Sequence, residues 1–378
     1  MTLLDAMEEI EDTRIDRCKK HELVDILMIC LLGYFIGLTD IEGIAFWAKT
    51  QKERLSRVIG LKNGTPSADT IHRVLAMIDD KQLEKAFFSW THGMFKANPL
   101  KEDEIEVVAL DGKTIRRSNT AKDKKGAHIV SAWADRLGIA LAQVKVDEKS
   151  NEITAIPELL ELMDLKGVIV TIDAMGCQKK IVEKITEKKS DYLISLKGNQ
   201  STLHDDVKEF FSRDDKKFFE KFGVEEFTFG IEKDHGRTEK RDYKLCTNLD
   251  WLIQKDEWAN LKGVGMVKST RITDGIKTVD VRYFITSLTN VETAAKSMRA
   301  HWGIENNLHW TLDMMYNEDY TRSRKDHSPQ NLAVLRKIAL NLFKIAPNPT
   351  GKPNFSLHKK QITCMCDDDY LKTMLQML

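Results

Sequence analysis

The sequence lacks the long hydrophobic runs that are typical of membrane proteins and the net positive charge that is typical of proteins that bind polyanions. No stretch of its 378 residues reaches the roughly 20 apolar residues that a membrane-spanning helix requires. The nearest candidate, from Ile26 to Leu38, lies behind an acidic N-terminal segment and is expected to form a buried helix. Basic and acidic residues both number 58, so the formal net charge is zero. We therefore expect a soluble protein without a membrane partner, and the total charge alone does not indicate a polyanion partner.

Cysteine is also sparse, with six residues scattered along the chain and no spacing typical of a disulfide framework. This distribution favours reduced thiols in the cytoplasm. The only close pair is Cys364 and Cys366, and no second pair with zinc-finger spacing accompanies it. We therefore interpret both as ordinary thiols.

Two aspartates stand where apolar runs of strand length end. Asp111 closes the run Val107-Val108-Ala109-Leu110 and precedes Gly112, and Asp173 closes the run Val168-Ile169-Val170-Thr171-Ile172. In layered α/β folds the ends of buried strands are places where sites are built, because the sheet fixes the side chain while the following loop leaves it accessible. Both aspartates are therefore candidate active-site residues.

The order of expected elements from Ile105 onward is β-β-β-α-β-α-β. The elements are strands up to Asp111, at 128–133 and at 139–146, a helix at 156–165, a strand up to Asp173, a helix at 178–188 and a strand at 192–196. Three strands joined by short turns form an antiparallel meander, and crossovers through helices create parallel neighbours. This order predicts an α/β protein with the mixed sheet of the ribonuclease H-like fold. The first and fourth strands of that fold are adjacent, so Asp111 and Asp173 are expected to meet.

Three domains are expected. Residues 1–98 carry helical patterns, and one helix capped by Ser67 either packs on its neighbours or reads DNA. Residues 99–345 form the ribonuclease H-like domain, with a β-rich insertion at about 201–289 that contains strands near 262–270 and 279–288. Residues 346–378 form a C-terminal tail.

A third acid, Glu305, lies in an expected helix from Val291 to about Met315. His301 and His309 stand four residues to either side of Glu305, on the same face of a regular helix. Two aspartates and a glutamate are hard oxygen ligands, which suit Mg²⁺ or Mn²⁺ better than zinc. A zinc site of Glu305 and the two histidines is an alternative, but it lacks the His-Glu-x-x-His motif and leaves the aspartates unexplained.

Basic residues follow the acids along the chain, among them Lys113, Arg116 and Arg322. A track for a phosphate backbone beside a metal site is expected to have this composition. Taken one at a time, most such residues belong to solvated loops and helix faces. Metal ions held by the acids would activate water or a 3′-hydroxyl for attack on a phosphodiester.

Four stretches resemble the H-repeat-associated DDE transposases of bacterial insertion sequences. They are Ala109-Leu110-Asp111-Gly112-Lys113-Thr114, Thr171-Ile172-Asp173-Ala174-Met175-Gly176, Tyr283-Phe284-Ile285-Thr286-Ser287-Leu288, and the segment from Arg299 to Trp310. The resemblance covers nearly the whole chain. It implies metal-dependent cleavage and strand transfer of double-stranded DNA at element ends, with Asp111, Asp173 and Glu305 as catalytic metal ligands. Joining two DNA ends favours a homodimer on DNA, in the cytoplasm and associated with the nucleoid.

The chain departs from the pattern of broader relatives at three positions around the glutamate. Those relatives carry tyrosine, arginine and lysine where this sequence has Met298, His301 and Leu312. Candidate substitutes for contacting phosphate are His301 itself, His309, Arg322, and the segment containing His235 and Arg237. Two alternatives to the transposase remain open: an inactive DNA-binding descendant, and an endonuclease of the same fold that cuts without joining.

Overall fold

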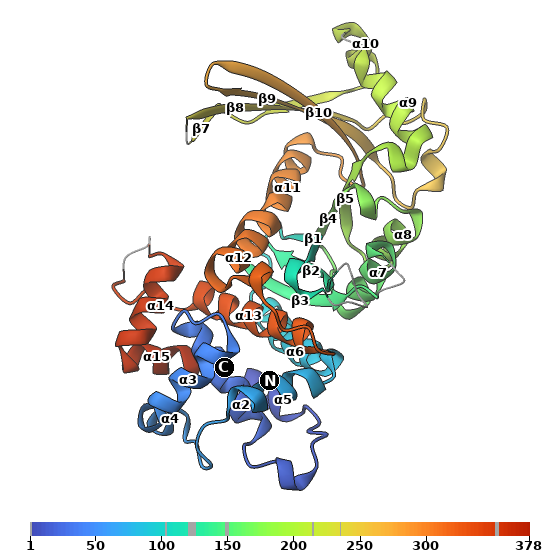
Figure 1. The fold of residues 1–378 in the computed structure, drawn as a ribbon. Helices are drawn as coiled ribbons and strands as arrows, with labels where there is room; N and C mark the ends of the chain where they lie inside the picture. The colour runs from blue at the N-terminus through green and yellow to red at the C-terminus, as the bar shows by residue number, and fades with distance from the viewer. Residues whose placement is uncertain are drawn as a thin grey trace. The chain divides into compact units, whose positions relative to one another are not determined.

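The computed structural model describes residues 2–102, 104–119, 126–147, 151–213, 215–234, 236–351 and 355–378 (Figure 1). The chain divides into two compact units, which are described separately. The first unit comprises Met1–Lys101, Gly112–Lys149 and Glu305–Leu378, and the second comprises Glu102–Asp111 and Ser150–Ile304. No helix among the described residues is both long enough and apolar enough to cross a membrane.

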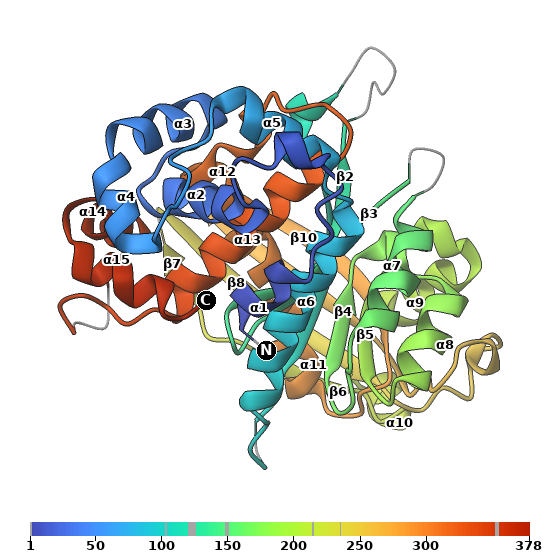
Figure 2. The same ribbon diagram turned by 90° about the horizontal axis from the view of Figure 1, so that it is seen from below.

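The first unit is mainly helical. Its helices are α1 (Leu3–Glu8), α2 (Leu23–Phe35), α3 (Ile41–Thr50), α4 (Lys52–Ile59), α5 (Ala68–Met77), α6 (Asp80–Ala97), α12 (Trp310–Tyr316), α13 (Ser328–Ile345), α14 (Leu357–Cys366) and α15 (Asp368–Leu375). Helix α13 is buried over nearly its whole length and packs against α2, α5 and α6 (Figure 2). Helix α2 is buried, as the sequence predicts, and the side chain of Ser67 caps α5 by accepting a hydrogen bond from the Thr70 N–H.

Ten strands form one mixed sheet in the order β3-β2-β1-β4-β5-β10-β9-β8-β6, with β7 paired to β8. The strands are β1 (Val107–Thr114), β2 (His128–Ala134), β3 (Ile139–Lys145), β4 (Ile169–Ile172), β5 (Asp191–Leu196), β6 (Glu225–Thr228), β7 (Glu232–Asp234), β8 (Arg237–Cys246), β9 (Gly263–Thr273) and β10 (Ile276–Thr286). Strands β2 and β3 are antiparallel, and β4 is parallel to both β1 and β5. This strand order confirms the expected ribonuclease H-like arrangement.

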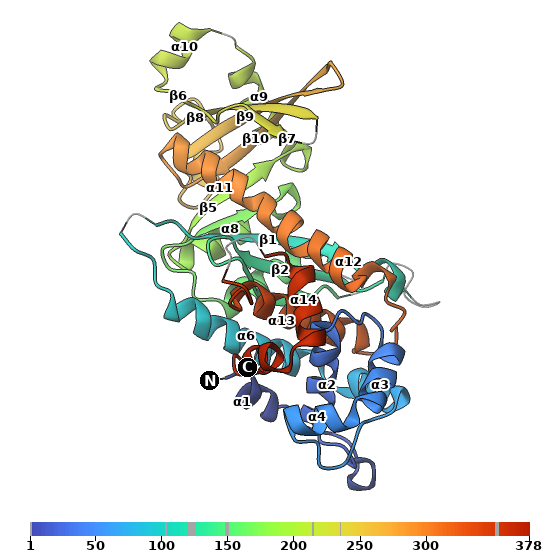
Figure 3. The same ribbon diagram turned by 90° about the vertical axis from the view of Figure 1, so that its left-hand side faces the viewer.

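The second unit contains the parallel strands and the helices around them. These helices are α7 (Glu152–Leu162), α8 (Lys179–Glu187), α9 (Ser201–Ser212), α10 (Lys216–Lys221) and α11 (Val291–Gly303). Helix α11 lies against the sheet, where Ala294 and Ala295 pack with Tyr243, Val267 and Phe284 (Figure 3). Small side chains on the helix allow it to approach the sheet closely.

Strands β9 and β10 form a long hairpin in this unit. The two residues between them, Asp274 and Gly275, have φ of 51° and 78°. Two positive φ values are the mark of a type I′ turn, whose twist matches that of the flanking strands. Both strands are longer than the sequence predicts, because pairing continues without interruption to this turn.

Three elements differ from the expectations in their boundaries. Strand β1 does not end at Asp111 but continues to Thr114. Helix α7 starts at Glu152 rather than Ile156, since the side chain of Asn151 caps it by accepting from the Ile153 N–H at 3.1 Å. The expected single helix from Val291 to Met315 is interrupted, because a π-helix, η6 (Ile304–His309), follows α11.

Candidate active site

Asp111 and Asp173 lie at neighbouring positions of the sheet in the second unit. Strands β1 and β4 are parallel, and Leu110 is paired with Ile172. Each aspartate directly follows one of these paired residues, so Asp111 within β1 and Asp173 just after β4 occupy adjacent positions of neighbouring strands. The half-buried Asp111 is also the last residue of the first segment of this unit, Glu102–Asp111.

Asp173 is held by the turn that it begins. Its carboxylate accepts hydrogen bonds from the Met175 N–H at 2.9 Å and from the Gly176 N–H at 3.4 Å, which caps the 3₁₀-helix η3 (Ala174–Gly176). Burial raises the pKa of Asp173, and the nearby charge of Glu152 raises it further, while the two N–H groups act in the opposite direction. A cation beside this carboxylate would stabilise its ionised form.

His301 joins helix α11 to strand β4. Its Nδ1 lies 3.0 Å from Oγ1 of Thr171, two residues before Asp173. Burial lowers the pKa of His301 to about 4, so the imidazole is neutral at pH 7. The contact fixes the end of α11 next to the strand that carries Asp173, and Glu305 follows His301 by four residues along the chain.

The π-helix η6 carries Glu305 and His309 in the first unit. Glu305 is exposed and His309 is 4% exposed, although a carboxylate oxygen of the one and a ring nitrogen of the other lie within 4.8 Å. Burial lowers the pKa of His309 to about 3, and the charges of Lys337 and Lys113 lower it further. The two side chains therefore sit in different environments, unlike the single face of a regular helix that the sequence suggests.

Lys113 is bound to acidic side chains of the first unit. Its Nζ lies 2.5 Å from Oδ1 of Asp313 and 3.1 Å from Oε2 of Glu318. Burial lowers the pKa of Lys113, but these two carboxylates outweigh burial and raise it above its ordinary value. The lysine thus remains charged while its ammonium group is already engaged.

The predicted phosphate-binding residues are distributed over both units. Arg116 and Arg322 are exposed in the first unit, and Arg116 also forms an ion pair with Asp319 at 3.2 Å. Arg237 lies in the second unit opposite Thr273, near the tip of the β9–β10 hairpin, where it pairs with Glu239. This tip lies at one end of β10, and Thr286 lies at the other end. At about 3.3 Å per residue the two ends are roughly 30 Å apart. His235 lies outside the described residues.

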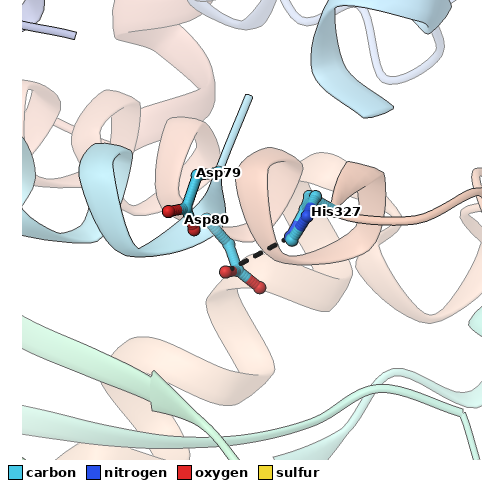
Figure 4. A group of neighbouring side chains, drawn as sticks. All are labelled: Asp79, Asp80 and His327. Carbon is cyan, nitrogen blue, oxygen red and sulfur yellow. Dashed lines mark ion pairs between the residues drawn. The ribbon is translucent and has the colours of Figure 1, made fainter. Parts of the chain in front are cut away.

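A second group of possible metal ligands occurs in the first unit, at Asp79, Asp80 and His327 (Figure 4). Nδ1 of His327 lies 3.3 Å from Oδ1 of Asp80, which joins the start of α6 to the start of α13. The Asp79 carboxylate caps α6 by accepting from the Lys81 N–H at 3.1 Å. Helix capping and ion pairing account for this cluster.

Sequence reasoning did not identify the buried charges beside Lys113. Glu318, Arg336 and Lys337 are 2%, 1% and 3% exposed. A signal was available for two of them, because Arg336 and Lys337 interrupt the otherwise apolar pattern of Leu332 to Leu340. Two adjacent cations in a helix that is buried on all sides indicate acidic partners. Glu318 gives no such signal.

Two carboxylates at adjacent positions of a ribonuclease H-like sheet, Asp111 within β1 and Asp173 directly after β4, are typical of the nucleic-acid-processing proteins of this fold. Comparison with known proteins specifies the family. Residues 4–91 match the family described as "DDE_Tnp_1-associated", and residues 102–342 match the family described as "Transposase DDE domain". The chain belongs to this DDE transposase family.

Individual relatives have similar lengths. "Putative transposase YncI" of Escherichia coli O157:H7 is 39% identical over 91% of this chain and 87% of its own. "H repeat-associated putative transposase YhhI" of Escherichia coli strain K12 is 35% identical over 99% of this chain and 97% of its own. These matches confirm the resemblance to H-repeat-associated transposases.

Among solved structures, the synaptic complex of piggyBac transposase with hairpin DNA is similar at a TM-score of 0.42 and 10% identity. The match covers 100% of this chain and 77% of that one. A likeness of this size is too weak to bear on the function of this chain.

Proposed function

We propose that this protein is an active transposase that cleaves double-stranded DNA at the ends of an insertion element and joins those ends to target DNA. Asp111, Asp173 and Glu305 would hold Mg²⁺ or Mn²⁺, and the protein would act as a homodimer on chromosomal DNA in the cytoplasm. The observation that carries the proposal is the parallel register of β1 and β4, in which Asp111 and Asp173 directly follow the paired residues Leu110 and Ile172.

The donor set suits the proposed metal. Three carboxylates supply hard oxygen ligands, which Mg²⁺ and Mn²⁺ prefer. Burial around Asp173 raises its pKa, and a bound cation would favour the ionised carboxylate again. When bound, such ions activate the attacking oxygen and stabilise the leaving oxygen in phosphoryl transfer.

The surrounding residues have separate roles in this proposal. His301 anchors α11 to Thr171 and thereby positions the chain that leads to Glu305. Since its imidazole is neutral at pH 7, it adds no positive charge. The exposed guanidinium groups of Arg116 and Arg322 would contact DNA phosphates, as would Arg237 at the hairpin, and Lys113 would keep its positive charge near the scissile group.

The test is metal-dependent cleavage and joining of DNA that carries the sequences flanking the gene. We expect the wild type to cut in Mg²⁺ or Mn²⁺, and Asp111→Asn and Glu305→Gln each to reduce cutting at least about 100-fold, more than the loss of a group that merely supports a metal ligand. Both variants should still bind DNA, because each change removes a negative charge near phosphate. Glu292→Gln is the matched control, since Glu292 is exposed on α11 and pairs with Lys296.

The alternatives give different results in the same assay. Cutting without joining would identify an endonuclease, and binding without cutting by the wild type would identify an inactive descendant. Equal cutting by the wild type and Glu305→Gln would refute the assignment of Glu305.

A further inference from the structure

The far half of strand β10 forms an open edge of the sheet in the second unit. Strand β5 pairs with β10 only over Tyr283–Thr286, whereas β9 pairs with it along its whole length (Figure 1). Among the described residues, no strand pairs with the other side of Ile276–Arg282, and all seven residues of this stretch are exposed. We call this stretch the open edge of β10. Alternate residues along it direct their backbone N–H and C=O groups toward solvent.

The side chains at the open edge are apolar for an exposed strand. Ile276, Val279 and Val281 are 69%, 50% and 40% exposed, and Ile272 on the adjacent strand β9 is 41% exposed. Native proteins usually protect an exposed edge with charged side chains, a proline, a bulge, or a covering helix or loop. Pairing of β9 with β10 is regular up to the turn, and the edge contains no proline. An edge of this kind is a template for pairing with another strand.

The charged residues of the open edge are compatible with such pairing. Asp280 and Arg282 lie on the same side of the strand, and Oδ2 of the aspartate lies 2.7 Å from Nε of the arginine. The guanidinium of Arg282 also lies over the ring of Trp302, at 5.4 Å from its centroid. Lys277 lies on the opposite side of the strand, together with the two valines. That side is therefore mainly aliphatic.

A protein partner suits the open edge better than DNA does. Surfaces that bind DNA are polar and strongly positive, whereas this edge carries three aliphatic side chains, and one of its two cations is already paired with an acid. The backbone groups of an open edge are satisfied by another extended chain. A second copy of this protein supplies such a strand, because the same edge is exposed on each copy.

The symmetric antiparallel register centred on Val279 is self-complementary. In a twofold dimer whose sheets join edge to edge, residues that lie directly opposite each other are on the same face of the joined sheet. With Val279 opposite its own copy, the other pairs are Thr278 with Asp280, Lys277 with Val281, and Ile276 with Arg282. This register pairs all seven residues of the edge and places no like charges directly opposite each other.

Other centres of symmetry are less favourable. A centre at Asp280 places that acid opposite its own copy, and a centre at Lys277 does the same for the lysine, so like charges meet in both cases. A centre at Thr278 pairs fewer strand residues, because Val281 would lie opposite Gly275 of the turn. Centres beyond Asp280 would require the space that β5 occupies.

We propose that the open edge of β10 pairs with the same edge of a second copy, so that the sheets of the two copies join through their β10 strands. This pairing deepens the proposed function and rests on it for the choice of partner, because a homodimer on DNA needs a surface where two copies meet. Seven residues are fewer than the roughly 20–30 per side of a standard interface. The dimer is therefore expected to dissociate in the micromolar range, and binding of both copies to one DNA molecule would strengthen it.

Sedimentation velocity of the full chain, in EDTA and without DNA, measures the dimer. Val279→Lys places two lysines opposite each other at the twofold axis, and we expect it to raise the dimer dissociation constant at least about 10-fold. Ile253→Lys is the matched control, since Ile253 belongs to the same unit, is 91% exposed and lies outside the edge. A wild type that stays monomeric up to its solubility limit, or equal effects of the two substitutions, would overturn the proposal.

Disulfide cross-linking tests the register without introducing a charge. The background carries Cys18→Ser and Cys366→Ser, because these two cysteines are exposed. Directly opposite residues of an antiparallel pair have Cα atoms about 4.5–5.5 Å apart, which is within the range of a disulfide. Val279→Cys should therefore form a cross-linked dimer on oxidation with copper phenanthroline. Val281→Cys should not, because four residues at about 3.3 Å each separate it from its copy.

The outcomes separate the pairing from the proposed function. Cross-linking of Val279→Cys alone supports the pairing, whereas equal cross-linking at both positions, or at neither, would contradict it. Metal-dependent DNA cleavage by the wild type is measured in parallel. A dimer that does not cut DNA would refute the proposed function and leave the pairing intact, and a monomer that cuts DNA would refute the pairing alone.

Discussion

Glu318 in the first unit and Glu239 in the second are buried to the same extent, but their cationic partners are not. Both glutamate side chains are 2% exposed. The partners of Glu318 are Lys113 and Arg336, which are 15% and 1% exposed. Glu239 lies beside three arginines, of which Arg271 is 37% exposed. Water thus reaches the second cluster from one side, while the first is largely desolvated.

The difference shows how buried charge can serve two purposes. Burial opposes ionisation of each glutamate, but the neighbouring cations outweigh burial and hold both pKa values below the ordinary value. Glu239 is directly opposite Arg271 in the β8–β9 pair, so its cluster stabilises a sheet surface. Glu318 instead holds Lys113, which follows Asp111 by two residues. Its cluster therefore supports the region of the candidate site.

The largest effect is expected when the desolvated cluster is broken. Glu318→Gln leaves the buried Lys113 and Arg336 without their shared carboxylate and should destabilise the protein by about 3–5 kcal/mol. Urea denaturation measures this change. A loss below about 1 kcal/mol would mean that water enters the cluster and that the contrast with Glu239 is unfounded.

A smaller change in stability is expected when Glu84 is substituted. At alkaline pH this substitution should stabilise the protein, whereas Glu318→Gln destabilises it. Its carboxylate accepts from Nε2 of Gln143 at 3.0 Å, and Oε1 of Gln143 accepts from Lys337 at 2.8 Å. Burial raises the pKa of Glu84 to about 8. The folded state therefore favours the protonated acid, and this contribution is complete below pH 4.5 and lost as the pH rises through 8.

Glu84→Gln removes this titration. We expect the variant and the wild type to be equally stable at pH 5, and the variant to be more stable by about 2 kcal/mol at pH 9, a value reduced because Glu84 is only half-buried. Thermal denaturation at both pH values provides the measurement, and Glu53→Gln is the exposed control in the same unit. A difference that does not depend on pH would show that Glu84 is not protonated in the folded protein.

The smallest effect is expected in the solvated cluster. Glu239→Gln should destabilise the protein by about 1–2 kcal/mol, because water can solvate the arginines that lose their partner. The contribution of Glu239 is complete above pH 4.5 and is lost as the pH falls through its depressed folded-state pKa. Urea denaturation at pH 7 and pH 3.5 should show a smaller effect of the substitution at the lower pH.

The sequence predicted the arrangement of β1 to β5 because each of these buried strands contains a short apolar run. That order predicts that β1 and β4 are neighbours, whereas the register that pairs Leu110 with Ile172 is seen only in the structure. The cluster around Glu318 could not be predicted in the same way. Its members come from β1, η7 (Glu318–Tyr320) and α13, and only the packing of the folded unit brings them together.

The boundaries of the elements that contain Asp111 and Glu305 show a second limit of prediction from sequence patterns. An acid and a glycine suggest that β1 ends at Asp111, but its second half is kept in the sheet, and Thr114 Oγ1 lies 2.7 Å from Nδ1 of His128. The π-helix at Ile304–His309 has no compositional signal, because a wider turn depends on local packing rather than on residue type. Both features concern geometry that hydrophobic periodicity does not encode.

The π-helix also changes the relation between spacing along the sequence and the direction in which side chains point. One additional residue in a turn rotates every later side chain by about 100° relative to an uninterrupted α-helix. The position seven residues after Glu305, Leu312, is 1% exposed and belongs to the core, whereas the next residue, Asp313, holds the ammonium of Lys113. Residue-by-residue alignment with relatives that have a regular helix here would therefore match side chains that point in different directions.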